Sequence, residues 1–486
     1  MDNREDAVIG VASSARPFLV AARFVENPCT TLVVTAGEDA ADTFARNVGA
    51  FVGEERVLRF ADYEGNPFAL DAPLQPRLHG MRLEALWALQ SGKPVIVVAS
   101  ARALLRKIAA PKDEIAKPLV LKQGVDLSEY PQGLVESFED LADVLVSMGY
   151  DNAGQLDGPG TFCLQGGAID IYPGNLPYPV RCDFFGDELD EIRRFLPSTG
   201  QTISSLSEIE IFPVREFSND IAVLRKAQRD IAKRAGTNKE MRELLERIED
   251  DSKELPDVLS AYILQDATTV GDYLPKKALT VLIEPRSLFD DAQHALDEYA
   301  KLAQGTSIPV HDVFATATEL NFGSNPRATY VSIMRVGVEL DSELVVKRVE
   351  VAGDPEKLYG RLRSLAEAGF TVVFSVPHFR ARQEIKLALV DLGIPINEVL
   401  DVVGDESAKL RRGQVNIVDV DIPLGMIFPA AKMALVSLAD TQGSMATRKR
   451  SRVDVTEITF PYKPGDYVVH AAHGVAFFRD IVRQDV

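Results

Sequence analysis

The sequence predicts an α/β protein in which a parallel-sheet domain carries an inserted, strand-rich α+β domain. One pattern recurs along the chain: a short β-branched apolar run, a small or polar turn, and an amphipathic helix. Such units begin at Thr30, Lys93, Ala278 and Phe370. Apolar strands followed by helices are typical of parallel sheets covered on both faces. Between the second and third units apolar and polar residues alternate and Gly and Pro are frequent, which predicts strands joined by turns.

These changes of pattern divide the chain into segments. The charged stretch from Ser218 to Glu254 predicts helices broken at Gly236, and residues 321–325 (NFGSN) predict a linker. The last twenty-odd residues are too few to bury a core, so we expect them to begin a β-rich domain. The expected segments are 1–115 (first α/β domain, first part), 116–212 (inserted domain), 213–325 (first domain, second part), 336–440 (small second α/β domain), 441–459 (basic linker) and 460–486 (start of the β-rich domain).

The composition limits the function classes. Acidic residues outnumber basic ones by 72 to 53, which gives a formal net charge of -19. A carboxylate-rich surface repels phosphates, so tight DNA binding by this chain is not expected, although a local basic patch stays possible. No apolar run approaches the ~20 residues of a membrane helix. The acidic start MDNREDAVIG lacks a secretion signal and three cysteines lie far apart, so we expect a cytoplasmic protein with no membrane partner.

A degenerate phosphate loop precedes the first expected helix. A working loop needs Gly-x-x-x-x-Gly-Lys-Ser/Thr, whose amides, lysine and hydroxyl hold the phosphates and Mg²⁺. This chain has Gly10, but Ala15, Arg16 and Pro17 at the last three positions. Ala15 adds a Cβ where the backbone should approach a phosphate, and Pro17 lacks both a hydroxyl and an amide hydrogen. Taken alone, the segment is also compatible with an ordinary turn and helix start; in either case ATP hydrolysis is not expected.

No other motif supplies catalytic chemistry. The sequence contains no Asp-Glu-x-His strand end and no Gly-x-Ser-x-Gly. The six histidines are scattered without metal-ligand spacing, so we expect them to be structural residues at strand ends. We therefore expect no catalytic residue, no metal site and no cofactor in this chain.

Two segments carry a family resemblance. Gly167–Pro173 (GAIDIYP) and Val180–Phe195 (VRCDFFGDELDEIRRF) closely resemble the damage-recognition helicase UvrB and its relatives, the transcription-repair coupling factors (Mfd). The stretches Ser198–Thr202 and Asp62–Phe68 agree with this resemblance.

Two features favour the coupling factors over UvrB. UvrB keeps a working phosphate loop, which is degenerate here. The segment Lys463–Val475 is similar to the start of the polymerase-binding domain shared with CarD-type regulators. The residues that carry this similarity are Gly465, Asp466, His470, His473 and Gly474.

The resemblance implies a recruiting module without ATPase activity that brings UvrA, and with it excision repair, to stalled RNA polymerase. It implies polymerase β-subunit binding through the C-terminal domain, which is expected to be incomplete here. It also implies that ATP, Mg²⁺ and DNA are bound by motor domains that this chain lacks. Two alternatives remain at this point: a UvrB-like ATPase or helicase, and a transcription regulator acting through the CarD-like end.

The expected UvrA-binding surface lies on the Val180–Phe195 hairpin. Strand alternation places Arg181, Asp183 and Phe185 on one face. The resemblance implies UvrA contacts at Arg181 and Phe185, and Gln165 stands where the family usually has a third contact residue, an arginine. The alternative is that Phe185 packs in the core and Arg181 pairs with Asp183. If the surface is exposed, Arg181→Ala with Phe185→Ala is expected to abolish UvrA binding without lowering the melting temperature.

Overall fold

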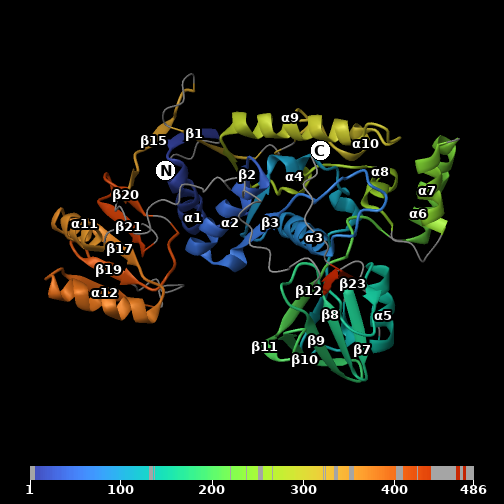
Figure 1. The fold of residues 1–486 in the computed structure, drawn as a ribbon, viewed down its shortest axis with the longest axis horizontal. Helices are drawn as coiled ribbons and strands as arrows, with labels where there is room; N and C mark the ends of the chain where they lie inside the picture. The colour runs from blue at the N-terminus through green and yellow to red at the C-terminus, as the bar shows by residue number, and fades with distance from the viewer. Residues whose placement is uncertain are drawn as a thin grey trace.

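The protein folds into an α/β body with two further domains attached to it (Figure 1). The computed structural model describes residues 6–130, 135, 137–218, 220–236, 238–249, 255–264, 266–320, 322, 325–332, 338–349, 355–400, 409–423, 425–438, 467–470 and 474–477. The strand-rich inserted domain lies below the body in Figure 1, and the small second α/β domain lies beside the N-terminus. The expected fold class is confirmed.

A seven-stranded sheet forms the centre of the first domain, and all its strand pairs are parallel. Its central strands have continuous apolar runs because both faces are covered. Every residue of β2, β4 and β13 is buried. In sheet order the strands are β15 (Ser342–Leu344), β1 (Asp6–Val11), β14 (Arg327–Val331), β13 (Leu279–Ile283), β2 (Thr31–Thr35), β4 (Ile96–Ser100) and β3 (Val57–Phe60).

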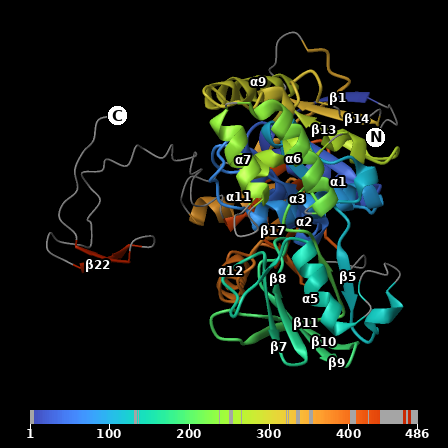
Figure 2. The same cartoon turned by 90° about the vertical axis from the view of Figure 1, so that its right-hand side faces the viewer.

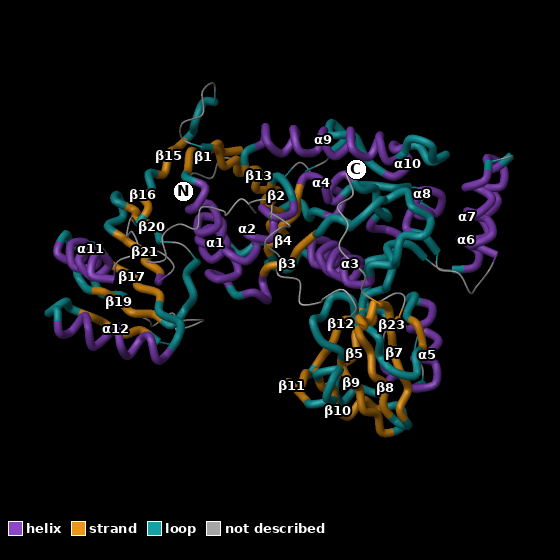
Figure 3. Tube along the Cα trace, in the orientation of Figure 1, coloured by secondary structure: helices purple, strands orange, loops and turns teal. Residues whose placement is uncertain are grey.

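Helices cover both faces of this sheet (Figure 3). On one face α1 (Arg16–Glu26) and α2 (Glu38–Val52) pack against Val33, Val98 and Val281. The helices on the other face are α3 (Pro76–Ser91), α4 (Ala101–Leu105) and α9 (Pro285–Leu302). The helices α6 (Ile221–Ala235), α7 (Lys239–Glu249), α8 (Ser260–Ile263) and α10 (Val310–Val313) extend this second layer. Within the described part of the chain, no helix combines the length and apolar character needed to cross a bilayer.

The expected end of the first domain at residue 325 is wrong. Strand β14 follows that position and lies between β1 and β13 in the first sheet, and β15 pairs with β1. Phe322 and Asn325, expected in a linker, are buried. The second domain therefore starts after β15 and not at residue 336. The pairing of β14 with β1 joins residues more than 300 positions apart, so local pattern cannot reveal it.

The inserted domain is built on a six-stranded sheet. The chain enters the inserted domain through β5 (Leu119–Lys122) and leaves it through β12 (Glu208–Ile211). These two strands form an antiparallel pair. Helix α5 (Phe138–Ser147) packs on the core face of the six-stranded sheet. In sheet order its strands are β11 (Thr202–Leu206), β10 (Glu188–Phe195), β9 (Val180–Phe185), β8 (Ala168–Tyr172), β7 (Thr161–Gln165) and β6 (Asp151–Asn152).

The second α/β domain packs directly on the first. Its sheet order is β16 (Lys347–Arg348), β20 (Met426–Phe428), β21 (Met433–Ser437), β17 (Thr371–Ser375), β19 (Val415–Val418) and β18 (Ile396–Val399). Helices α11 (Pro355–Glu367) and α12 (Phe379–Asp391) cover one face. The other face joins the cluster around α1, where the Phe18 and Phe428 ring centroids lie 5.0 Å apart.

Near the end of the chain a hairpin pairs β22 (Tyr467–His470) with β23 (Gly474–Phe477), with His470 opposite Gly474 (Figure 2). Gly465, Asp466 and His473 lie outside the described residues. The basic linker at 441–459 also lies outside them.

Helix α3 joins the first domain to the inserted domain. A Cβ added at Gly80 would lie 2.4 Å from the Asn175 amide nitrogen, so helix and loop touch backbone to backbone. Beside this contact, the buried Arg82 guanidinium pairs with Glu216, with Nε 2.5 Å from Oε1. His79 lies between the Tyr63 hydroxyl at 3.0 Å and Asp257 at 3.1 Å. His79 is thus structural but lies within a helix, as do His294 and His311, so the expectation of strand-end positions is wrong for all three.

Gly80→Ala should lower the melting temperature because the added methyl group overpacks the joint, at a cost of about 1–3 kcal/mol. Gly360→Ala is the matched control, since a Cβ at this exposed helical glycine of α11 meets nothing within 4 Å. The control should be neutral or stabilising by up to about 1 kcal/mol. Thermal unfolding followed by circular dichroism checks both, and an equal response of the two variants would contradict the close joint.

Candidate functional site

The β9–β10 hairpin presents a defined outer face. Gly186, with φ of 66°, makes the turn, and Phe185 lies opposite Glu188. The register shifts between Leu189 and Glu191, which leaves Asp190 as an extra residue. Because of this bulge, Ile192 points to the core and Arg193 lies opposite Arg181 on the outer face.

Arg181 is held in place by its neighbours on the sheet. Its Nε and Nη2 donate to the two carboxylate oxygens of Asp170, each at 2.6 Å, and Nη2 also donates to Gln165 Oε1 at 3.0 Å. The Asp170 side chain is only 5% exposed. The hydrogen bonds to Asp170 raise the pKa of Arg181 above its usual range. The structure therefore brings Arg181 and Gln165 together, with the guanidinium fixed in orientation.

The hydrogen bond of Asp183 and the exposure of Phe185 decide between the two interpretations of this strand, an exposed binding face or a core-facing one. Asp183 accepts a hydrogen bond from Arg193 Nη2 at 2.5 Å, so the alternative pairing of Arg181 with Asp183 is wrong. Phe185 is 86% exposed, which excludes the alternative that its ring packs in the core. The structure thus places an immobilised arginine and a projecting phenyl ring on one face of a rigid strand.

Sequence reasoning missed two residues of this face. Asp170 and Arg193 fix Arg181 and Asp183, respectively. Core-facing residues of a regular strand are two or four positions apart, but the apolar residues Leu189 and Ile192 are three apart. This spacing is the sequence signal for the bulge that turns Arg193 outward.

The degenerate phosphate loop has the expected strand–turn–helix setting. It connects β1 through the short 3-10 turn Ser13–Ala15 to α1, with Pro17 in the first turn of the helix. Arg16 is buried, and its Nη2 donates to Glu284 Oε1 at 2.6 Å. The same carboxylate oxygen accepts hydrogen bonds from the Ser332 amide and hydroxyl.

Glu284 follows β13 and adopts a left-handed conformation with φ of 53°. Arg16, which stands at the position of the phosphate-binding lysine, therefore forms an internal ion pair with Glu284. This pair joins the segment that follows β1 to the end of β13. A nucleotide phosphate would have to compete with this carboxylate.

A cavity of about 1040 Å³ opens at the carboxyl ends of β2, β3 and β4, and its lining does not suit an anion. Its single basic lining residue, Arg102, pairs with Asp62 and Glu298. Seven carboxylates line this cavity: Glu38, Asp39, Asp42, Asp62, Glu64, Asp291 and Glu298. Such a lining repels phosphates, and no group of three or more described side chains is arranged to hold a metal ion.

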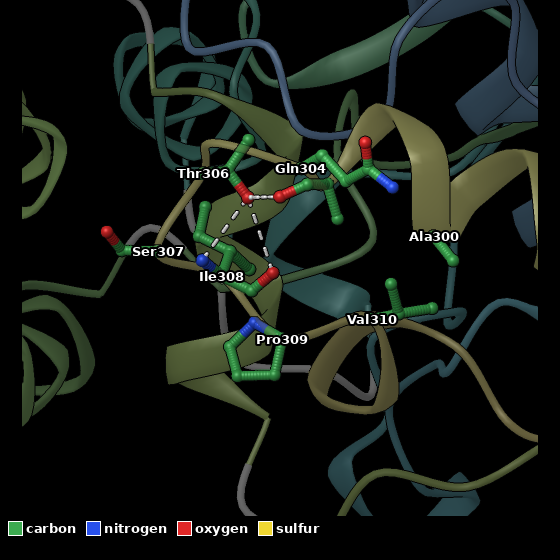
Figure 4. Close-up of a pocket in the computed structure, with 8 residues that line it drawn as sticks. Ala300, Gln304, Thr306, Ser307, Ile308, Pro309 and Val310 are labelled. Carbon is green, nitrogen blue, oxygen red and sulfur yellow. Dashed lines mark hydrogen bonds between the residues drawn. The ribbon is translucent and has the colours of Figure 1, made fainter.

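A second, shallower pocket of about 300 Å³ lies between α9 and α10 (Figure 4). The Thr306 hydroxyl stabilises the loop that lines this pocket through hydrogen bonds to the backbone of Ala303 and Ile308. No ionisable side chain lines it, so it holds no acid–base chemistry.

The comparisons with known proteins agree with these features. The family model of the UvrB interaction domain matches residues 132–217, and that of the CarD-like/TRCF RID domain matches residues 462–486. A transcription-repair-coupling factor of Bacillus subtilis is 23% identical over 511 aligned residues, covering 98% of this chain and 42% of that protein. One from Haemophilus influenzae is 24% identical and covers 95% of this chain and 41% of its own length.

Over nearly its whole length the chain is similar to transcription-repair-coupling factors. UvrABC system protein B of Chlorobaculum tepidum is 27% identical, but the match covers only 45% of this chain and 32% of that protein. This limited coverage favours a coupling factor over a UvrB protein. The chain spans about 42% of the length of the curated coupling factors it matches and resembles their N-terminal portion.

Arg16→Ala and Glu284→Ala should show strong energetic coupling in this chain. Removing either partner leaves a buried group with fewer hydrogen bonds, at a cost of about 1–3 kcal/mol. The double variant should lose less than the sum of the single ones, which a double-mutant cycle of urea unfolding measures. Arg380 and Glu384, an exposed pair on α12, provide the control cycle, with an expected coupling of about 0.5 kcal/mol or less. Equal coupling in both cycles would contradict the internal ion pair.

Proposed function

We propose that this chain is the recruiting portion of a transcription-repair coupling factor and that its inserted domain binds UvrA through the outer face of β9. The observation that carries the proposal is Phe185, which is 86% exposed beside an immobilised Arg181 inside the matched UvrB interaction domain. An exposed aromatic ring on a rigid element is costly to leave in water and is typical of a binding hot spot.

The two residues contribute in different ways. Burying the Phe185 ring in a partner pocket contributes roughly 1.5–3 kcal/mol. Arg181 Nη1 has no hydrogen-bond partner among the described residues, and the side chain is 34% exposed, so a carboxylate or carbonyl of UvrA can accept from it. Since Asp170 already fixes the guanidinium, little side-chain entropy is lost on binding.

Gln165 adjusts the strength of this contact. Its side-chain oxygen accepts from Arg181, whereas an arginine at this position adds a donor. A lost charge-assisted hydrogen bond costs about 1.5–3 kcal/mol. We propose that UvrA binding here depends more on Phe185 and less on a second guanidinium.

The remaining activities belong to the longer protein. The β22–β23 hairpin lies in the segment matched by the CarD-like/TRCF RID domain and contributes to binding the RNA polymerase β subunit. ATP-driven DNA translocation, with ATP and Mg²⁺, resides in motor domains outside these 486 residues. The Arg16–Glu284 pair supports a first domain that does not hydrolyse ATP.

Phe185→Ala should abolish co-elution with UvrA in size-exclusion chromatography while leaving the melting temperature unchanged, because the ring contacts mainly solvent. Val146→Ala is the matched control: Val146 is 52% exposed on α5, which packs on the opposite face of the sheet, and UvrA should still co-elute. Retention of UvrA by Phe185→Ala would show that the proposed face is wrong.

Arg181→Ala should weaken UvrA binding and also destabilise the domain, contrary to the expectation of an unchanged melt. Asp170 is buried and would lose its bidentate partner, at a cost of about 1–3 kcal/mol. The further change Asp170→Asn should recover part of the melting temperature but not UvrA binding. An unchanged melting temperature in Arg181→Ala alone would contradict the ion pair.

A further inference from the structure

Helix α6 concentrates positive charge on a chain of net charge -19. Five of its fifteen residues are basic and exposed, and Asp230 is its only acidic residue. The basic residues are Arg225, Lys226, Arg229, Lys233 and Arg234. This is the local basic patch that the overall composition left open.

Three of these cations form a row. Arg225, Arg229 and Lys233 are four residues apart, so they lie on one side of the helix over about 12 Å. Lys233 pairs with Asp230 at 2.9 Å. Arg229 Nε donates only to the Arg225 backbone carbonyl, at 3.2 Å. Among the described residues, the side chains of Arg225 and Lys226 have no hydrogen-bond or ion-pair partner.

Helix stability explains only part of this pattern. Cations in the last turn interact favourably with the helix dipole, which accounts for Lys233 and Arg234. Arg225 and Arg229 lie before that turn, and like charges four residues apart destabilise a helix by about 0.2–0.5 kcal/mol per pair. An anionic ligand along the row would remove this repulsion.

The row is held in a fixed position on the first domain. Ala227, Ile231 and Ala235 bury the opposite side of α6. The loop that connects α6 to α7 is tied to the loop shown in Figure 4: Asn238 donates to the Ser307 hydroxyl, and the Ser307 amide donates to Glu240 Oε2 at 2.7 Å. Figure 1 shows α6 and α7 at the edge of the molecule, apart from the β9–β10 hairpin.

The chemistry of the row fits a nucleic-acid backbone better than a protein. Of the exposed neutral residues of α6, Ala222 and Ala232 are small. Ile221 is 66% exposed, but it lies at the N-terminal end of the row, four residues before Arg225, and is a single aliphatic side chain. Protein interfaces need a desolvated apolar or aromatic centre and are depleted in lysine. Phosphate contacts need only cations, and they carry most of non-specific DNA affinity through counterion release.

We propose that the outer face of α6 binds the phosphate backbone of duplex DNA without sequence preference. This contact is separate from the proposed UvrA surface and adds to the DNA contacts expected of the motor domains. With three cations on the backbone, the expected slope of log K against log salt is about -2.7. Binding is therefore weak and confined to low salt, and the net negative charge of the chain disfavours DNA contacts over its acidic surfaces.

The test measures fluorescence anisotropy of a labelled mixed-sequence duplex with the 486-residue chain over a series of salt concentrations. Arg225→Glu with Arg229→Glu should weaken binding by about tenfold or more at low salt and reduce the slope by about 2. Lys357→Glu with Arg361→Glu on α11 is the matched control, since it makes the same change in net charge at the same spacing on another helix. Arg225→Gln with Arg229→Gln should give an intermediate loss.

The outcomes separate the possibilities. A selective loss in the α6 variants, with unchanged circular dichroism, supports the proposal. An equal loss in the α11 control, or no DNA binding by the unmodified chain at low salt, overturns it. Displacement of the duplex by polyglutamate at a lower charge concentration than by unlabelled DNA also overturns it, because the row would then favour an acidic protein. Neither result bears on UvrA binding, which Phe185 tests independently.

Discussion

The buried ion pair between Arg82 and Glu216 fixes the inserted domain on the first domain. Arg82 is fully buried on α3, and its guanidinium also lies 3.9 Å from the centre of the Phe60 ring. Burial alone would raise the pKa of Glu216. The Arg82 and His79 charges and the hydrogen bonds with Arg82 and Tyr63 together outweigh burial and lower this pKa below its usual value. Breaking such a desolvated pair leaves an uncompensated charge, which is strongly destabilising. The pair lies where the chain returns from the inserted domain, so the direction in which β9 presents Phe185 depends on it.

The usual ligand-binding edge of the first domain's parallel sheet does not suit a phosphate. In a parallel α/β sheet, ligands bind at the carboxyl ends of the strands. Here the Arg16–Glu284 ion pair occupies that edge beside β1, and a carboxylate-lined cavity lies beside β2 and β4. Both features oppose phosphate binding. The scaffold instead carries the inserted domain, in which the outer face of the β9–β10 hairpin is the proposed docking surface.

Local pattern was sufficient to predict the strand–helix units, the hairpin turn at Gly186 and the shared face of Arg181, Asp183 and Phe185. It left open whether Phe185 packs in the core, and only the family resemblance favoured an exposed face. It was not sufficient for contacts that join distant segments. The pairing of β14 with β1, the Arg16–Glu284 ion pair and the Arg82–Glu216 joint each link residues more than 100 positions apart. The Asp190 bulge shifts the register by one residue and thereby chooses Arg193 as the partner of Asp183. Counting back from the turn without this bulge would place Ile192 opposite Arg181.

Hydrogen–deuterium exchange of the chain, recorded alone, with MgATP and with UvrA, tests the account most directly. If the phosphate site is closed, MgATP should not change the exchange rates. If the docking face is intact, UvrA should protect amides centred on the β9–β10 hairpin. Protection of residues 10–17 by MgATP, or UvrA protection that leaves this hairpin unchanged, would contradict it.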